Sequence, residues 1–65
     1  MKSYSSKEVI AILIADGWYE VGYVGDHKQF KHPVKKGKVT VTHPIKTMPI
    51  HILKSIEKQA GLKFA

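Results

Sequence analysis

The chain has 65 residues, a formal net charge of +6 and no cysteine. This length holds one hydrophobic core, so we expect a single domain over residues 1–65. The absence of cysteine excludes disulfides, thiolate zinc sites and a cysteine nucleophile. No apolar run approaches the roughly 18–20 residues of a membrane span, and the first residues lack a signal-peptide pattern, so we expect a cytoplasmic protein without membrane contact.

Two amphipathic helices are predicted near the ends of the chain. The first covers about residues 5–16, because Ser5-Ser6-Lys7-Glu8 matches a capping box and apolar residues follow at helical spacing. Gly17 suits the end of this helix. The second helix begins at Pro49, which fits a first turn, and is closed by Gly61. The informative residues of the first helix are mostly apolar, so this helix is expected to be structural.

Three strands are predicted between the helices, over residues 18–24, 27–32 and 38–43. Gly22 is a candidate for a β-bulge, and Gly25-Asp26 is a typical tight turn between the first two strands. The order predicts an α+β fold, α-β-β-β-α, in which two helices pack on one face of a three-stranded antiparallel sheet.

Alternation along the second strand assigns its side chains to two faces. Phe30 is the large apolar residue, so the face that it shares with Lys28 and His32 is expected to point to the core. The opposite face is expected to be open to solvent. It carries His27, Gln29 and Lys31.

Charge gives the strongest global indication of function. Every basic residue other than histidine is a lysine, and the absence of arginine argues against bidentate recognition of guanine in a major groove. Clustered positive charge attracts phosphate backbones, so we expect an anionic partner rather than only a solvated surface. The clustered lysines are Lys28, Lys31, Lys35, Lys36, Lys38 and Lys46.

A histidine beside lysines suits cleavage of RNA. The 2′-hydroxyl is the nucleophile, so the reaction needs a base, an acid and stabilisation of the phosphorane charge. Histidine serves either proton transfer near neutral pH. We expect His27 to be the general acid or base, without a metal or cofactor. The expected RNA-binding residues are Lys28, Gln29, Lys31 and Lys38.

The remaining histidines have weaker claims. His32 and His43 fall on apolar faces and are expected to be packed and hydrogen-bonded, whereas His51 in the first turn of the second helix is expected to be exposed. Their spacing matches no tetrahedral zinc site. The serines lie near termini or helices, away from the histidine turn, so a serine triad is not supported.

Order and residues together resemble the HicA toxins, the YcfA-type family with a fold like the double-stranded-RNA-binding domain. The matching positions are Gly17-Trp18, Gly25-x-His27, Phe30-Lys31-His32-Pro33, Val39-Thr40-Val41 with His43-Pro44, Ile52-Leu53-Lys54-Ser55-Ile56 and Lys58-Gln59-Ala60-Gly61. The resemblance implies the toxin of a type II toxin–antitoxin system. It implies an mRNA interferase that blocks translation, is neutralised by a HicB-type antitoxin and uses His27 for catalysis.

The chain departs from the family pattern at two places. The family usually has Ser and often a second His around the catalytic His, where this chain has Asp26 and Lys28. Asp26 could favour imidazolium and repel phosphate, or it could cap the turn. Lys28 keeps positive charge but does not titrate near neutral pH. The family also often has Val-Pro before His-Pro, where this chain has Val41-Thr42.

Three functions from different classes stay open. The first is an RNA endonuclease toxin, and the second is a non-catalytic RNA-binding domain of the same fold. A duplex-binding domain would need basic contacts from the second helix, which offers Lys54 and Lys58. The third is a protein-interaction domain whose basic surface meets an acidic antitoxin.

Overall fold

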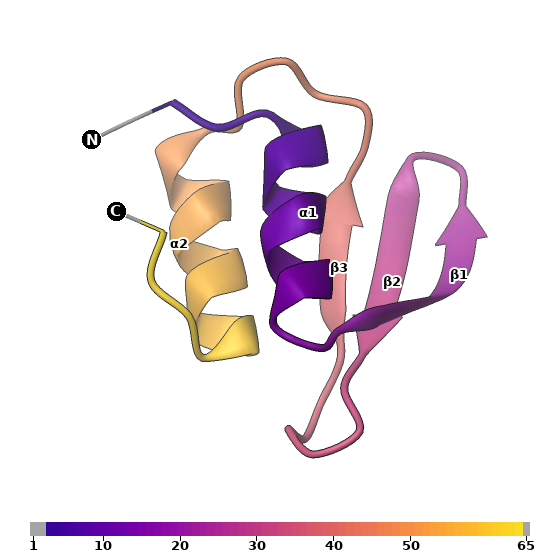
Figure 1. The fold of residues 1–65 in the computed structure, drawn as a ribbon. Coiled ribbons are helices and arrows are strands. Elements are labelled where there is room, and N and C mark those ends of the chain that lie inside the picture. Colours follow the sequence, from indigo (N-terminus) through magenta and orange to yellow (C-terminus); the bar gives the residue numbers. More distant parts are fainter. Residues whose placement is uncertain (1–2, 65) are drawn as a thin grey trace.

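Two helices lie on one side of a three-stranded antiparallel sheet, as the computed structural model shows over residues 3–64 (Figure 1). The strands follow their sequence order across the sheet, β1-β2-β3, so β2 is central. This arrangement confirms the predicted α+β fold. The elements are α1 (Ser6–Ala15), β1 (Tyr19–Val24), β2 (His27–Lys31), β3 (Val39–Thr42) and α2 (Ile50–Ala60).

The helix ends follow the predicted signals. Ser5 is the N-cap of α1, where its side chain accepts from the Glu8 amide at 3.1 Å while Glu8 Oε1 accepts from the Ser5 amide at 3.0 Å. This capping box satisfies amides that the helix leaves unpaired. Gly61 ends α2 in the left-handed conformation, with φ 66°. None of the helices within residues 3–64 is long and apolar enough to cross a membrane.

The strands are shorter than the sequence predicted. Trp18, His32, Lys38 and His43 were each expected at a strand end and lie outside the sheet. Trp18 is instead buried in the core, and His32 and His43 bond to other segments.

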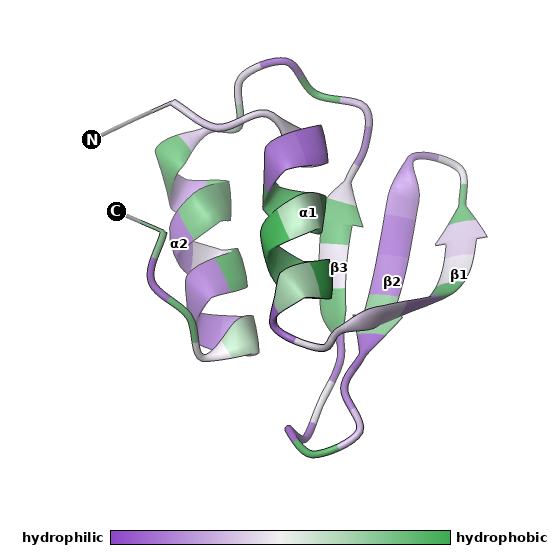
Figure 2. Cartoon of the chain, in the orientation of Figure 1, coloured by the Kyte–Doolittle hydropathy of each residue, from purple (hydrophilic) through white to green (hydrophobic). Residues whose placement is uncertain are grey.

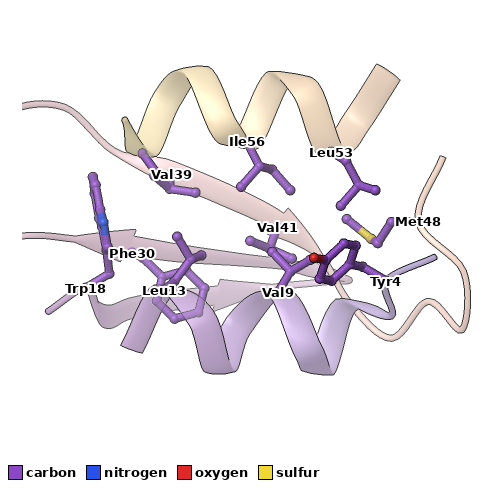
Figure 3. Close-up of a cluster of buried hydrophobic side chains, with 11 residues drawn as sticks. Tyr4, Val9, Leu13, Trp18, Phe30, Val39, Val41, Met48, Leu53 and Ile56 are labelled. Carbon is purple, nitrogen blue, oxygen red and sulfur yellow. The ribbon is translucent and has the colours of Figure 1, made fainter. Parts of the chain in front are cut away.

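The hydrophobic core fills the space between the two helices and the sheet face that they cover (Figure 3). Hydropathy coloring shows β2 as hydrophilic along most of its length, so the central strand carries little apolar surface beyond its core contact (Figure 2). That contact is Phe30, which is fully buried as predicted. The core residues are Tyr4, Val9, Leu13, Trp18, Phe30, Val39, Val41, Met48, Leu53, Ile56 and Ala60.

The strand register fixes which side chains share the other face of the sheet. His27 pairs with Val24 on β1 and with Thr42 on β3. Directly opposed residues of antiparallel strands point to the same face, and successive residues alternate. A bulge between Glu20 and Gly22 shifts the β1 register, so Gly22 pairs with Gln29. The face away from the helices, here called the open face, carries Tyr19, Gly22, Val24, His27, Gln29, Lys31, Thr40 and Thr42.

Candidate functional site

His27 is the first residue of β2, directly after the Gly25-Asp26 turn that joins β1 to β2 (Figure 1). Gly25 adopts φ 60°, a left-handed conformation that glycine reaches without the strain of a side chain. The Asp26 carbonyl accepts from the His43 amide at 2.7 Å, which ties the turn to the residue after β3. The His27 side chain is 55% exposed, so backbone contacts position an imidazole that solvent and ligands can reach.

One ring nitrogen of His27 faces a carboxylate. Asp26 Oδ1 lies 3.3 Å from Nε2 of His27, a contact that becomes an ion pair when the imidazole is protonated. The other nitrogen, Nδ1, makes no hydrogen bond to any residue in the 3–64 range. His27 therefore has one nitrogen beside an anion and one available for proton exchange with a ligand.

Two of the predicted RNA-binding residues, Gln29 and Lys31, lie on the same sheet face as His27, and a third, Lys38, contacts Gln29. Gln29 and Lys31 follow it along the open face, and Lys38 Nζ donates to Gln29 Oε1 at 3.2 Å. Lys31 is exposed and forms no ion pair with the described part of the chain. The residues of the open face include no acid, so positive charge dominates this face. Asp26, in the turn before His27, lies at its end.

Lys28, the fourth predicted RNA-binding residue, lies on the opposite face from His27. It pairs with Val41, which is buried in the core. Its Nζ contacts Glu20 Oε1 at 3.1 Å and stands 4.9 Å from the center of the Tyr23 ring. The structure thus places Gln29 and Lys31 on the same sheet face as His27, with Lys38 bonded to Gln29, and places Lys28 on the other face.

His32 has the packed role that the sequence predicted. Its Nε2 lies 2.7 Å from the Asp16 carbonyl, and its Nδ1 accepts from the amides of Val34 and Lys35, both at 3.0 Å. These bonds require the neutral ring with hydrogen on Nε2. A Cβ at Gly17 would lie 2.8 Å from His32 Nε2, so only glycine fits against this ring.

His43 is also packed, through a partner that the sequence analysis missed. Its Nδ1 lies 2.7 Å from Ser6 Oγ, and Ser6 Oγ also accepts from the Ile45 amide at 2.8 Å. Ser6 is fully buried. The sequence signal for this contact is a polar residue, Ser6, in the first turn of a helix whose inner face is otherwise apolar. His51 is exposed as expected.

A second lysine of the predicted cluster is occupied by intramolecular contacts. Lys35 Nζ donates to Asp16 Oδ2 at 2.6 Å and to the Ala60 carbonyl at 3.0 Å. The Lys35 hydrogen bond lowers the pKa of Asp16 from its ordinary value of 3.8, against a smaller opposing effect of desolvation. Trp18 Nε1 also donates to Asp16 Oδ2, at 3.2 Å. These contacts join α1, the segment after β2 and the end of α2.

No metal site competes with this arrangement in the described range. Residues 3–64 contain no group of three or more histidine, aspartate or glutamate side chains placed to hold a metal ion. The polar groups of the open face are the His27 imidazole, the Gln29 amide, the Lys31 ammonium group and the hydroxyls of Tyr19, Thr40 and Thr42.

Comparison with known proteins identifies the family. A family model described as the HicA toxin of bacterial toxin–antitoxin systems matches residues 6–62, a range that contains all five helices and strands and the His27 turn. A comparison with curated proteins found no match. The family works in toxin–antitoxin pairs, so membership implies a toxin role and an antitoxin partner. Since the match covers nearly the whole chain, the protein belongs to the HicA toxin family.

Proposed function

We propose that this toxin cleaves messenger RNA without a metal ion, with His27 as the general acid or base. One observation carries the proposal. An exposed imidazole with a free Nδ1 stands at one end of an open sheet face that presents Lys31 and Lys38 and includes no acid. Lysines bind phosphate as point charges, which fits contact with an RNA backbone independent of its sequence.

The proposed reaction uses the RNA's own nucleophile. The 2′-hydroxyl oxygen attacks the adjacent phosphorus, its proton passes to a base, and the bond from phosphorus to the 5′-oxygen breaks as that oxygen gains a proton. The products are a 2′,3′-cyclic phosphate and a 5′-hydroxyl. His27 Nδ1 is free to carry out one of these transfers, a contribution typically worth about 10²–10⁴-fold in rate. The positive potential that the lysines give to this face favors the build-up of negative charge on the phosphorane.

We propose that the antitoxin is of the HicB type and that it covers the open face. β1 is an edge strand, so its free backbone groups offer hydrogen bonds to such a partner. The exposed Lys31 offers a positive charge. Coverage of His27 would neutralise the toxin by excluding RNA.

Growth after induced expression tests the proposed function. We expect the wild-type chain to arrest growth and fragment cellular RNA, and His27→Ala, expressed at the same soluble level, to do neither. A soluble wild-type protein that leaves growth and RNA intact would contradict the nuclease proposal. Growth arrest by both proteins with intact RNA would favor binding without cleavage.

A further inference from the structure

Tyr19 stands at the end of the open face that is distant from His27. It pairs with Lys31, the last residue of β2, whereas His27 is the first. Four residues along a strand span roughly 13 Å, since each residue rises about 3.3 Å. The Tyr19 ring therefore lies on the same face as the imidazole and about one strand length from it.

The side chain of Tyr19, unlike those of the other two tyrosines, has no partner within residues 3–64. Tyr4 is buried, contacts the Phe64 ring and donates its hydroxyl to the Phe64 carbonyl. Tyr23 lies on the opposite face, with Lys28 over its ring and its hydroxyl bonded to the His43 carbonyl. Tyr19 is 50% exposed, and its side chain makes no hydrogen bond or ring contact with residues 3–64.

The surroundings of Tyr19 leave room for a flat apolar ligand attached to an anion. Gly22, the nearest β1 residue on the same face, has no side chain, and a Cβ there would lie 3.8 Å from Gln29 Oε1. Lys31 is directly opposite Tyr19, and Lys38 reaches Gln29 in the middle of the face. An aromatic ring with cations beside it is the usual arrangement for binding an unpaired nucleotide.

We propose that Tyr19 stacks on an unpaired base of the RNA while Lys31 contacts an adjoining phosphate. This inference rests on the proposed function and adds a base-binding position to it. The bases of a duplex are stacked on one another, so only a single strand can offer a base to this ring. The toxin would therefore require an unpaired nucleotide at a fixed distance, about one strand length, from the phosphate at His27.

Binding to RNA that is not cleaved tests the proposal. The parent protein for the test is His27→Ala, and the probe is a short labeled RNA without self-complementarity, followed by fluorescence anisotropy. We expect Tyr19→Ala to raise the dissociation constant about 5- to 100-fold, the range typical for loss of one base–aromatic stack. Tyr19→Phe keeps the ring and is expected to bind like the parent.

Tyr23→Ala is the matched control, because Tyr23 is 49% exposed but lies on the other face. We expect it to bind RNA like the parent. A fully paired RNA of the same sequence should not distinguish Tyr19→Ala from the parent. Circular dichroism and thermal unfolding of each variant show whether its fold is retained. Gly22→Leu provides a second test variant, because it fills the open face beside Tyr19 without changing the ring.

The outcomes separate this inference from the proposed function. Equal RNA binding by parent and Tyr19→Ala, or an equal loss in Tyr23→Ala, would overturn the stacking role even if the wild-type chain cleaves RNA. A loss confined to Tyr19→Ala and Gly22→Leu would support it even if the wild-type chain does not cleave RNA. Absence of RNA binding by the folded parent would overturn both. Loss of antitoxin binding alone in Tyr19→Ala would assign the ring to the protein partner and overturn the inference.

Discussion

Asp26 Oδ1 lies 3.3 Å from Nε2 of His27, which places a carboxylate next to the proposed catalytic imidazole. Both side chains are exposed, so solvent screens this contact. The negative charge of the carboxylate opposes the approach of a phosphate.

Removal of the Asp26 charge should improve binding of the RNA substrate. We expect Asp26→Asn and Asp26→Ser to lower KM about 2- to 5-fold at low ionic strength, because one repulsive charge near the phosphate is lost. The effect should shrink as salt is added. Steady-state cleavage at two salt concentrations measures it. A large fall in kcat with both variants would instead mean that Asp26 positions His27 for the reaction.

Lys31 and Lys28 offer a matched pair of charge changes on the two faces of β2. Lys31 is exposed on the open face, whereas Lys28 contacts Glu20 on the other face. We expect Lys31→Gln to weaken RNA binding and to reduce the slope of log affinity against log salt by about 0.7, the value for one phosphate contact on a single strand. Lys28→Gln should change neither quantity. A salt slope reduced equally by both variants would contradict the assignment of the RNA to the open face.

Acid should weaken the fold through Asp16. Lys35 lowers the pKa of Asp16 in the folded chain below 3.8. As pH falls, the unfolded state therefore takes up a proton on this carboxylate at a higher pH than the folded state does. The stability from this contact is fully present above the unfolded value of about 3.9 and is lost as pH falls through the lower, folded pKa.

Urea unfolding at pH 7 and near pH 3 measures this dependence. We expect the wild-type midpoint to fall in acid, and Asp16→Asn or Lys35→Gln to show a smaller fall from a lower starting value. Lys36→Gln, a change at an exposed neighbor, should behave like wild type. An acid-induced fall of the same size in Asp16→Asn and wild type would contradict the role of the Asp16–Lys35 contact.

Local patterns in the sequence predicted most of the fold. The capping box located the start of α1, and the position of Phe30 in the alternation of β2 assigned His27 to the open face. Both signals act within a few residues, so they can be interpreted without knowing the rest of the structure. The same alternation also put Lys28 on the face away from His27, although Lys28 was still included among the expected phosphate ligands.

Contacts between distant segments could not be predicted. Ser6 and His43 are 37 positions apart, and Lys35 reaches Asp16 over 19 positions. Nothing in either neighborhood of the sequence specifies its partner, because packing of the helices on the sheet creates these contacts. The contact with Asp16 explains why Lys35 is occupied within the chain, although the sequence placed it in the lysine cluster.

The most direct measurement is cleavage of a purified single-stranded RNA in the presence of EDTA, with analysis of the product ends. His27→Ala is compared with wild type, and His51→Ala, at an exposed histidine of α2, is the control. We expect wild type and His51→Ala to leave 2′,3′-cyclic phosphate and 5′-hydroxyl ends, and His27→Ala to be slower by about 10²–10⁴-fold. Products with 5′-phosphate ends, loss of cleavage in EDTA, or unchanged cleavage by His27→Ala would contradict the account.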